Sequence, residues 1–488
     1  MSRFVPGWIH ALAVVATVTL AGNANAAGDP GPVLATRARE PASLVAQGDF
    51  ILAGNRRSGT VSVINADEGR VVAEHQVARR IAHLVGIPNT QSVLVLDDAD
   101  RRLFKATLGN DSANVKLIAE VPLGAVRLAV APRRRQVFIS GKWSRTVVAL
   151  TLDENWENVL KTRTVSTPFA PRELLLVDAD RVLLAADAFG GRIAVIDASE
   201  GKLIAVRELA GHNIRGLAAS PDGKHLHVAH QKMPVRGLVD YEELHWGRLI
   251  VNTVQVLDAR KFLDGDDSRM AKGWLDSQGD IGNGAGDPSA VATGARGLVA
   301  VALSGVGEVA VRRSGYAKRI PVQSCPEALL VRGDRLHVAN RLSDSISVID
   351  LDRGKLIQTM SLGPTPELAA ADRGERLFFD AKLSHDQWMS CHSCHTDGHT
   401  AGFVVDTLGD GDYGAPKLVP SLLGTRGTGP WSWTGASTTL AAQVRKTATT
   451  TMHGEELTPR QTDDLVAYLL SLKPPPPRFR ASQTETER

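Results

Sequence analysis

A repeat of about 43 residues, running from about residue 41 to about residue 363, constrains the fold of this chain more than any other feature of its sequence. Each unit contains a short apolar run, and in most units a polar turn and an alternating segment follow it, as in residues 191–197 and 344–350. Alternation of β-branched residues with a period of two, bounded by Gly, Asp and Asn, is typical of strands. The apolar runs occupy residues 51–53, 93–96, 137–139, 182–184, 226–228, 298–301 and 336–338.

These units predict a seven-bladed, all-β propeller over residues 41–365. A period of this length is that of one four-stranded antiparallel blade, whereas a pair of β-sandwiches would not give so regular a spacing. Residues 366–380 read as two further strand-like pieces, so an eighth, incomplete unit and closure of the ring with the N-terminal strands are both open. The units are similar to the YVTN-type propeller repeats of exported bacterial proteins, and residues 350–355 match that pattern best.

The most chemically specific stretch is Cys391-His392-Ser393-Cys394-His395, which reads C-x-x-C-H. Two thiols at this spacing can form thioethers with the two vinyl groups of one porphyrin, and the adjacent imidazole can then ligate the iron. The sequence therefore predicts one covalently bound haem c, with Cys391 and Cys394 as attachment points and His395 as the proximal ligand.

A redox or a zinc site is the alternative interpretation of the paired cysteines. Zinc would need two further ligands at a matching spacing, but the only other cysteine, Cys325, lies far upstream. A thioredoxin-like pair would open the helix of a βαβ unit, and residues 388–390 follow no such pattern. Cys325 itself reads as a small, buried hydrophobic residue.

The N-terminus reads as a secretory signal peptide over residues 1–26. Arg3 provides the positive charge, residues 9–20 form a short apolar core, and an A-x-A cleavage site ends at Ala26. Cleavage there would leave an exported, periplasmic protein without a membrane span, and an uncleaved anchor is the alternative. Export agrees with haem c, which is attached outside the bacterial cytoplasm. With 56 basic and 53 acidic side chains, the charge balance gives no reason to expect binding to nucleic acid.

Residues 366–473 are expected to form a mostly helical cytochrome c domain, followed by a Pro-rich and polar tail over residues 474–488. Helices are predicted over residues 438–446 and 458–472. The second helix begins with a Thr-Pro pair, places leucines on one face and stops at a run of prolines. We expect this amphipathic helix to pack on the haem-bearing turn.

Several short segments around the C-x-x-C-H motif carry a resemblance to a known family: residues 374–384, 420–423, 428–435 and 457–469. In this order and spacing they resemble the C-terminal haem domain of the bacterial di-haem cytochrome c peroxidase and methylamine-utilisation family. The resemblance implies a haem-dependent oxidoreductase. However, enzymes of that family need two haems, and this chain has one C-x-x-C-H motif. Trp433 also stands where the family has a histidine, and both departures weigh against peroxidase activity.

The resemblance also implies a second axial ligand, because the family's electron-transfer haem takes a methionine downstream of the segment that contains Trp433. Here that methionine is Met452. A thioether opposite His395 would raise the reduction potential and leave no open coordination position, which suits electron transfer. The alternatives for this ligand are Met389, His399 and His453.

One position near the start of the first strand of each unit is also of chemical interest, because in propellers this strand borders the central channel. Four guanidinium groups facing two carboxylates could bind an anion there, since arginine offers paired planar donors. Alternatively, these groups pair with one another or with backbone carbonyls and join the blades. Taken one per unit, the residues are Arg80, Arg127, Arg172, Arg215, Ser289, Glu327 and Glu367.

Two insertions interrupt the fifth unit. The first lies between His230 and residue 252 and contains His245, Tyr241 and Trp246. Long loops on a regular scaffold are often functional, so we expect this one to pack over the haem edge or over a cavity between the domains. The second insertion, residues 264–287, is rich in Gly, Asp and Ser and reads as a linker.

Together these patterns predict an exported c-type cytochrome that transfers electrons through one haem. Its propeller would either hold a small molecule to be oxidised or dock a redox partner of the small cytochrome or cupredoxin type. One alternative is a peroxidase-like enzyme whose missing haem another chain supplies. The other is an interaction protein in which the propeller recognises a partner and the haem is a sensor. The fold by itself does not identify a substrate.

Overall fold

The computed structural model describes residues 37–110, 112–233, 238–266, 273–313, 315–407 and 410–477. The predicted signal peptide and the end of the predicted tail lie outside the described residues. None of the helices in the described part of the chain is both long and apolar enough to cross a membrane.

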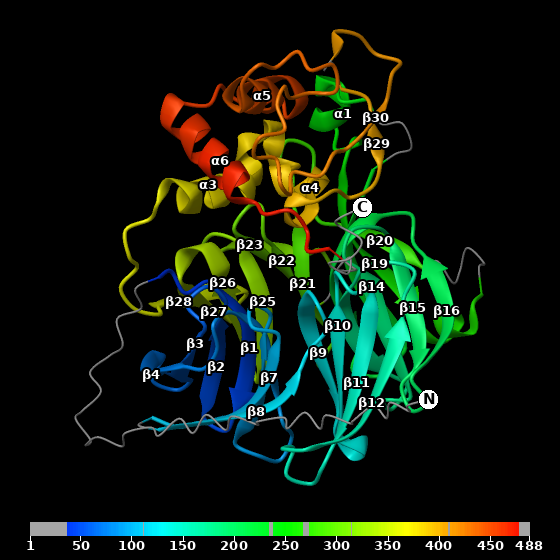
Figure 1. The fold of residues 1–488 in the computed structure, drawn as a ribbon, viewed down its shortest axis with the longest axis vertical. Helices are drawn as coiled ribbons and strands as arrows, with labels where there is room; N and C mark the ends of the chain where they lie inside the picture. Colours follow the sequence, from blue (N-terminus) through cyan, green and yellow to red (C-terminus); the bar gives the residue numbers. More distant parts are fainter. Residues whose placement is uncertain are drawn as a thin grey trace, which may run out of the picture. The chain divides into compact units, whose positions relative to one another are not determined.

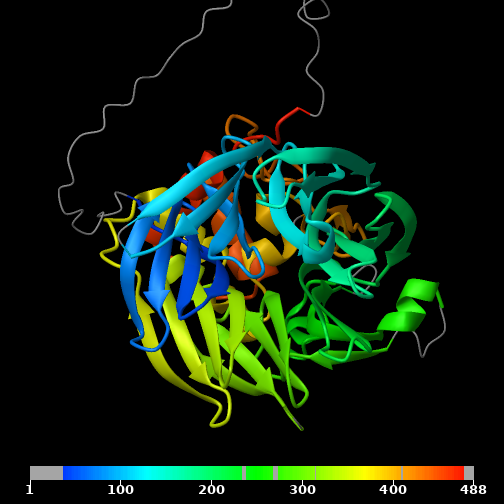
Figure 2. The same cartoon turned by 90° about the horizontal axis from the view of Figure 1, so that it is seen from below.

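Seven four-stranded antiparallel sheets form a propeller, which confirms the predicted architecture (Figures 1 and 2). The strands of each blade follow one another along the chain. The first four blades consist of β1 (Pro41–Gln47), β2 (Phe50–Asn55), β3 (Thr60–Asn65) and β4 (Arg70–Gln76); β5 (Ile81–Gly86), β6 (Ser92–Asp97), β7 (Arg102–Leu108) and β8 (Ala113–Glu120); β9 (Ala125–Ala131), β10 (Gln136–Gly141), β11 (Thr146–Leu152) and β12 (Val159–Ser166); and β13 (Pro171–Val177), β14 (Val182–Asp187), β15 (Arg192–Asp197) and β16 (Lys202–Glu208).

The last three blades follow the same order, and the fifth also carries helices α1 (Tyr241–His245) and α2 (Ala259–Asp264). Their strands are β17 (His212–Ala219), β18 (His225–Lys232), β19 (Val251–Asp258) and β20 (Trp274–Ser277); β21 (Pro288–Gly294), β22 (Leu298–Leu303), β23 (Glu308–Arg312) and β24 (Lys318–Pro321); and β25 (Pro326–Arg332), β26 (Arg335–Asn340), β27 (Ser345–Asp350) and β28 (Lys355–Ser361).

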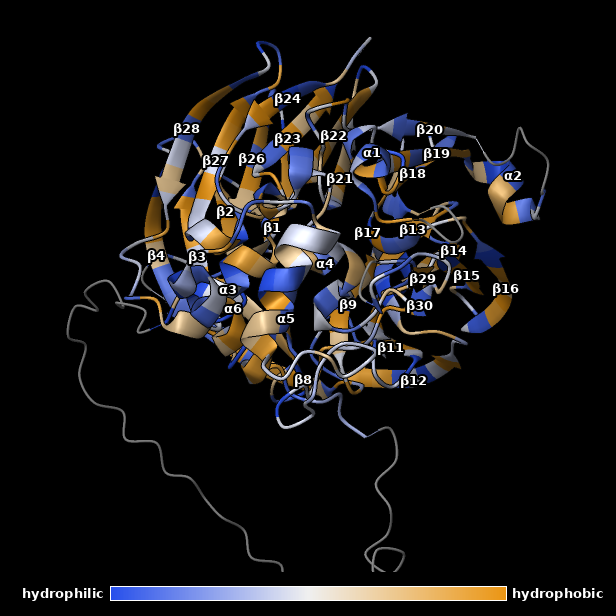
Figure 3. Cartoon of the chain, turned by 90° about the horizontal axis from the view of Figure 1, so that it is seen from above, coloured by the Kyte–Doolittle hydropathy of each residue, from blue (hydrophilic) through white to orange (hydrophobic). Residues whose placement is uncertain are grey.

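The blades pack on one another through apolar strand residues. Leu94 and Leu96 of β6 share one buried cluster with Val137 and Ile139 of β10, and similar clusters join the other neighbouring blades. In Figure 3 the hydrophobic colour concentrates along strands such as β22, β23, β26 and β27. The first strand of each blade contacts the first strand of the next, and β25 contacts β1, so packing closes the ring. Strands one residue out of register would turn these side chains to the wrong face.

Residues 366–380 do not form the two strand-like pieces expected from the sequence. They contain helix α3 (Ala370–Phe378), whose start is capped by the Asp372 carboxylate accepting a hydrogen bond from the backbone N–H of Ala369 at 3.0 Å. The helix contacts α6 (Pro459–Ser471) so closely that a β-carbon on Gly374 would lie 1.9 Å from the carbonyl oxygen of Asp464. The choice of helix over strand therefore depends on a partner about 90 residues away, which local alternation cannot show.

The second insertion of the fifth blade is not the linker that its composition suggested. It provides the outer strand β20, which pairs with β19 and completes the blade. The register joins Thr253 with Ser277 and Val256 with Trp274. Trp274, the first residue of β20, is of a type that favours strands. The surrounding Gly, Asp and Ser residues nevertheless made the segment read as a linker.

Among its described residues the C-terminal domain contains four α-helices and several single turns, and its predicted final helix is confirmed as α6. The Thr458 hydroxyl caps α6 by accepting from the backbone N–H of Gln461, and Leu465 and Leu469 are buried. The remaining elements are α4 (Cys391–Cys394), α5 (Leu440–Lys446), the π-helical turn η7 (Thr447–Thr451), the 3-10 turns η3 (Ala381–Leu383), η4 (His385–Gln387) and η5 (Thr396–Gly398), and the small strands β29 (Val404–Val405) and β30 (Lys417–Leu418). Two further 3-10 turns lie in the propeller, η1 (Pro132–Arg134) and η2 (Arg341–Ser343).

Candidate haem site

The C-x-x-C-H motif forms one helical turn, α4, which ends at the residue before His395. Ser390 caps this turn, because its hydroxyl accepts a hydrogen bond from the backbone N–H of His392 at 3.1 Å. The backbone N–H of His395 donates to the carbonyl of Cys391 at 2.9 Å. The turn therefore holds both cysteines and the histidine in one fixed arrangement.

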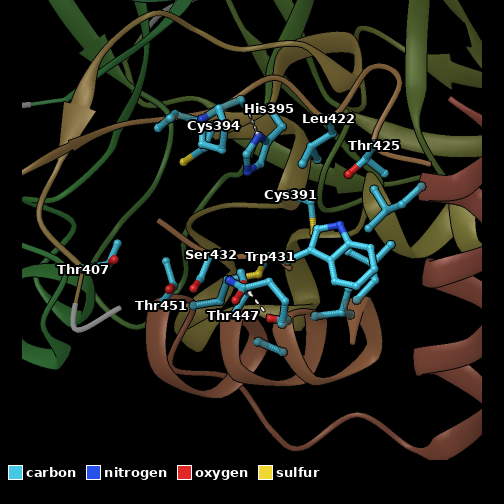
Figure 4. A pocket seen from close by; sticks show the side chains of 18 of the residues that line it. Cys391, Cys394, His395, Thr407, Leu422, Thr425, Trp431, Ser432, Thr447 and Thr451 are labelled. Atoms are coloured by element: carbon cyan, nitrogen blue, oxygen red, sulfur yellow. Dashed lines mark hydrogen bonds between the residues drawn. The ribbon is translucent and has the colours of Figure 1, made fainter. Parts of the chain in front are cut away.

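A cavity of about 480 Å³ opens beside this turn, and both cysteines and His395 line it. Most of the remaining lining is apolar and comes from α3, α5, α6 and the segment from residue 417 to residue 433. In Figure 4, His395 and Cys394 lie on one side of the pocket, and Thr447 and Thr451 of η7 lie on the opposite side. A largely apolar cavity with a few polar groups is typical of a cofactor site.

His395 is oriented as a metal ligand would be. Its Nδ1–H donates to the carbonyl oxygen of Pro420 at 2.9 Å, which leaves the lone pair of Nε2 free for a metal ion. Burial lowers the pKa of His395 to about 4, so the imidazole is neutral near pH 7. Both properties are needed for an axial haem ligand.

The two cysteines lie in surroundings that do not favour thiolates. Burial raises the pKa of Cys391 and of Cys394 to about 12. Within the part of the chain that the structure describes, no group of metal-ligand side chains includes either cysteine. Cys325 is buried, as predicted, and lines a different cavity. These observations argue against a zinc site at the motif.

The candidates for the second axial ligand divide into two pairs. Met389 and Met452 are 2% and 3% exposed and both line the cavity, whereas His399 and His453 are absent from its described lining. Met452 directly follows η7. Thr447 and Thr451 of that turn lie opposite His395 in Figure 4. Of the described residues that line the cavity, His395 is the only histidine.

The residues present thus fit a haem c. The site combines two thiols at the attachment spacing, an imidazole with a free Nε2, buried thioethers and an apolar cavity.

Comparison with known proteins agrees with this chemistry. Residues 369–481 match the family model described as di-haem cytochrome c peroxidase. The C-terminal domain is a haem-binding, cytochrome-type domain similar to that family. Below we call it the haem domain. No curated protein matches the chain.

Two solved structures are similar to part of this chain to different degrees. Hydrazine synthase from Kuenenia stuttgartiensis has a TM-score of 0.55 and 18% sequence identity, covering 66% of this chain and 99% of that one. A virginiamycin B lyase from Staphylococcus aureus has a TM-score of 0.47 and 14% identity, covering 63% of this chain and 94% of that one. At these identities the likeness concerns the fold alone, and only the first is close enough to support it.

The haem domain inserts an aspartate, Asp397, among cations at the mouth of the propeller. Its carboxylate lies 3.0 Å from the Arg172 guanidinium, 2.5 Å from that of Arg215 and 3.1 Å from the Lys142 ammonium. Burial by itself would raise the pKa of Asp397, but these cations outweigh it and hold the pKa well below its usual value. Arg172 and Arg215 therefore bind an anionic group of the same chain.

The other residues of the set that was taken one per propeller unit have partners other than Asp397, or none of this kind is described for them. Arg127 pairs with Glu173 at 3.1 Å, and Arg80 pairs with Asp98 at 2.6 Å. Glu367 lies exposed after the last blade. Bulges in the first strands shift the register from blade to blade, which is why one spacing could not select equivalent residues. A cavity of only about 190 Å³ remains at the mouth, lined by Arg127, Arg172, Arg215, Ser289 and Glu327 among others.

A second anchor, Asp287, holds the motif itself. This propeller residue precedes β21, and its carboxylate accepts hydrogen bonds from the hydroxyls of Ser390 at 2.5 Å and Ser393 at 2.7 Å. Gln231 also donates to it at 3.1 Å. Sequence reasoning missed Asp287 and Asp397. Only the position of Asp397, two residues after His395, could have drawn attention to it.

The first insertion of the fifth blade packs against the haem domain. Leu244, Leu249 and Ile250 belong to one buried cluster with Met389 and Met452. His245, at the end of α1, contacts Asp386 of the haem domain, while His230 is buried within β18. Neither histidine is among the described residues that line the cavity.

Proposed function

We propose that the chain is a periplasmic c-type cytochrome, exported by the signal peptide expected over residues 1–26, that transfers electrons through one covalently bound haem. The observation that carries this proposal is the composition of the cavity. Both motif cysteines, His395 and the buried thioether of Met452 line it, and His395 is the only histidine in its described lining. Two strong axial ligands would leave no open position for a substrate.

Bound haem would supply one-electron redox chemistry, and each part of the site has a role toward it. Cys391 and Cys394 would hold the porphyrin through thioethers, and His395, oriented by the Pro420 carbonyl, would ligate the iron from one side. Met452 would provide the second ligand to the iron. The apolar lining excludes water, which favours the less charged, reduced state.

The propeller would position this cytochrome for a partner. Because Asp397 already neutralises part of the cation cluster at the mouth, oxidation of a small anion there is less well supported, and the propeller is better assigned a docking role. We propose a redox partner of the small cytochrome or cupredoxin type.

The match to the di-haem cytochrome c peroxidase family favours peroxide reduction as a second candidate function. Trp433, in the position of the family's histidine, lines the cavity, and its indole N–H donates to the carbonyl of Leu418 at 3.1 Å. An indole N–H is a donor only and offers no basic lone pair, so Trp433 cannot act as a general base toward peroxide. Electron transfer is therefore the first candidate.

Replacing Met452 with alanine tests the proposed ligand set. We expect the oxidised protein to lose its far-red methionine–haem absorption band and the reduction potential to fall by on the order of 100 mV, because axial ligands tune haem potentials over about 0.8 V. Absorption spectra and a redox titration of the full-length, haem-loaded protein measure both changes.

Met389→Ala is the matched control, because Met389 is equally buried and lines the same cavity. It should lose similar packing but keep the absorption band. Persistence of the band in Met452→Ala, or its loss in Met389→Ala, would show that Met452 is not the ligand.

A further inference from the structure

A second group of metal-ligand side chains lies where the first insertion of the fifth blade meets the haem domain. His245 is the last residue of α1, and His385 and Asp386 begin the turn η4. Their side chains are 34%, 23% and 19% exposed, so they are accessible from solvent. The proposed haem function uses none of these three residues.

The three donor atoms form a small triangle. The Nδ1 atom of His245 lies 2.8 Å from Oδ2 of Asp386, and the Nε2 atom of His385 lies 3.1 Å from the same oxygen. The two nitrogens are 3.4 Å apart. Ligands about 2.1 Å from a metal ion are separated by about 3.0 Å at right angles and by about 3.4 Å at tetrahedral angles. The triangle therefore has the dimensions of one face of a coordination sphere.

Backbone hydrogen bonds from the propeller fix the turn that carries Asp386. The N–H of Gly284 in the propeller donates to the carbonyl of Asp386 at 2.7 Å, and the N–H of Gly286 donates to that of Gln387 at 3.1 Å. Both Asp386 and Gln387 have left-handed backbone conformations, with φ of 52° and 64°. Such conformations persist only where the surroundings enforce them, and they are frequent at functional sites.

The helix that carries His245 is fixed independently. The Asp240 side chain caps α1 by accepting from the N–H of Glu243 at 2.7 Å, and Leu244 is buried in the cluster that contains Met389 and Met452. The Tyr241 ring lies 4.5 Å from the His385 ring and covers the group on one side. The ligands are thus preorganised by contacts that do not involve their donor atoms.

We propose that His245, His385 and Asp386 bind one divalent transition-metal ion of the Zn²⁺ class. Two imidazole nitrogens and one carboxylate oxygen suit Zn²⁺ and related first-row ions, and the solvent-exposed side leaves room for water ligands. The ion would join the propeller to the haem domain. The metal site would also be connected to the proposed haem ligand, because the backbone N–H of His385 donates to the carbonyl of Met452 at 2.9 Å.

The test is calorimetric titration of ZnCl₂ into the full-length, haem-loaded protein after treatment with a chelator. We expect one equivalent of Zn²⁺ to bind, and binding to weaken about 100-fold or more in His245→Ala and in Asp386→Asn. Glu243→Gln, which removes a neighbouring carboxylate from the same helix, should bind Zn²⁺ as the wild type does.

A second measurement guards against misfolded variants. Zn²⁺ should raise the thermal unfolding midpoint of the wild type and of Glu243→Gln, but not that of Asp386→Asn, while the haem spectra of all three stay alike. Failure of the wild type to bind Zn²⁺, or equal binding by His245→Ala, would overturn the proposal. The three side chains would then form only a hydrogen-bonded contact, and the proposed haem function would be unaffected.

Discussion

Replacing Asp397 with asparagine is expected to lower the free energy of unfolding by about 3–5 kcal/mol, since removal of one partner from a buried ion pair leaves uncompensated charge. Three cations pair with this carboxylate: Arg172, Arg215 and Lys142. Arg215 also contacts His392, inside the C-x-x-C-H motif. Loss of the Asp397 carboxylate should therefore also destabilise the haem-bearing turn. Denaturant unfolding followed by circular dichroism measures the change.

Asp463→Asn provides the matched control, because Asp463 is an exposed aspartate on α6 of the same domain. A surface substitution of this kind should change stability by no more than about 0.5 kcal/mol. If the two variants have equal stabilities, Asp397 does not hold the haem domain on the propeller.

The effect of Asp397 should also depend on pH in a defined direction. Since the pKa of Asp397 is depressed in the folded state, the unfolded state binds this proton more tightly. The stabilisation is therefore fully present above the unfolded pKa of about 4 and is lost as the pH falls through the lower, folded pKa. The difference in stability between wild type and Asp397→Asn should shrink below about pH 4. A constant difference would contradict this assignment.

Replacing Asp287 with alanine is expected to be the second most damaging change, at about 3 kcal/mol or more. The carboxylate is 4% exposed, and its removal would leave the hydroxyls of Ser390 and Ser393 and the amide of Gln231 without this acceptor. A buried polar group that loses its partner costs about 1–3 kcal/mol. Because Ser390 caps the motif turn, the haem environment should change as well.

Asp287 variants can separate these effects. Asp287→Asn keeps the shape of the side chain and one acceptor oxygen, so it should lose less stability than Asp287→Ala. Both variants remove a buried negative charge beside the motif, and both should raise the haem reduction potential. Denaturant unfolding and redox titration report the two properties. Wild-type potentials in both variants would show that the charge of Asp287 does not influence the haem reduction potential.

The parts of this structure that could be predicted from the sequence are those that local pattern determines. The propeller follows from a repeat, the start of α6 from the capping residue Thr458, and the haem turn from five consecutive residues. In each case the residues that carry the signal also form the contacts.

The contacts between the domains could not be predicted, because they join residues far apart in the chain. Asp397 meets Arg172 across 225 positions, and Asp287 meets Ser393 across 106. Neither aspartate stands out in a protein of ordinary acidic content. The position taken once per unit was informative for Arg172 and Arg215. Of its two interpretations, anion binding is met by the chain's own carboxylate, that of Asp397.

The proposed function requires one six-coordinate, covalently bound haem that transfers electrons. Optical redox titration of the purified full-length protein, with and without peroxide, tests it most directly. We expect a single reversible one-electron transition, the methionine–haem band in the oxidised state and no turnover of peroxide. Two transitions from two haems, or rapid consumption of peroxide by the chain alone, would contradict it.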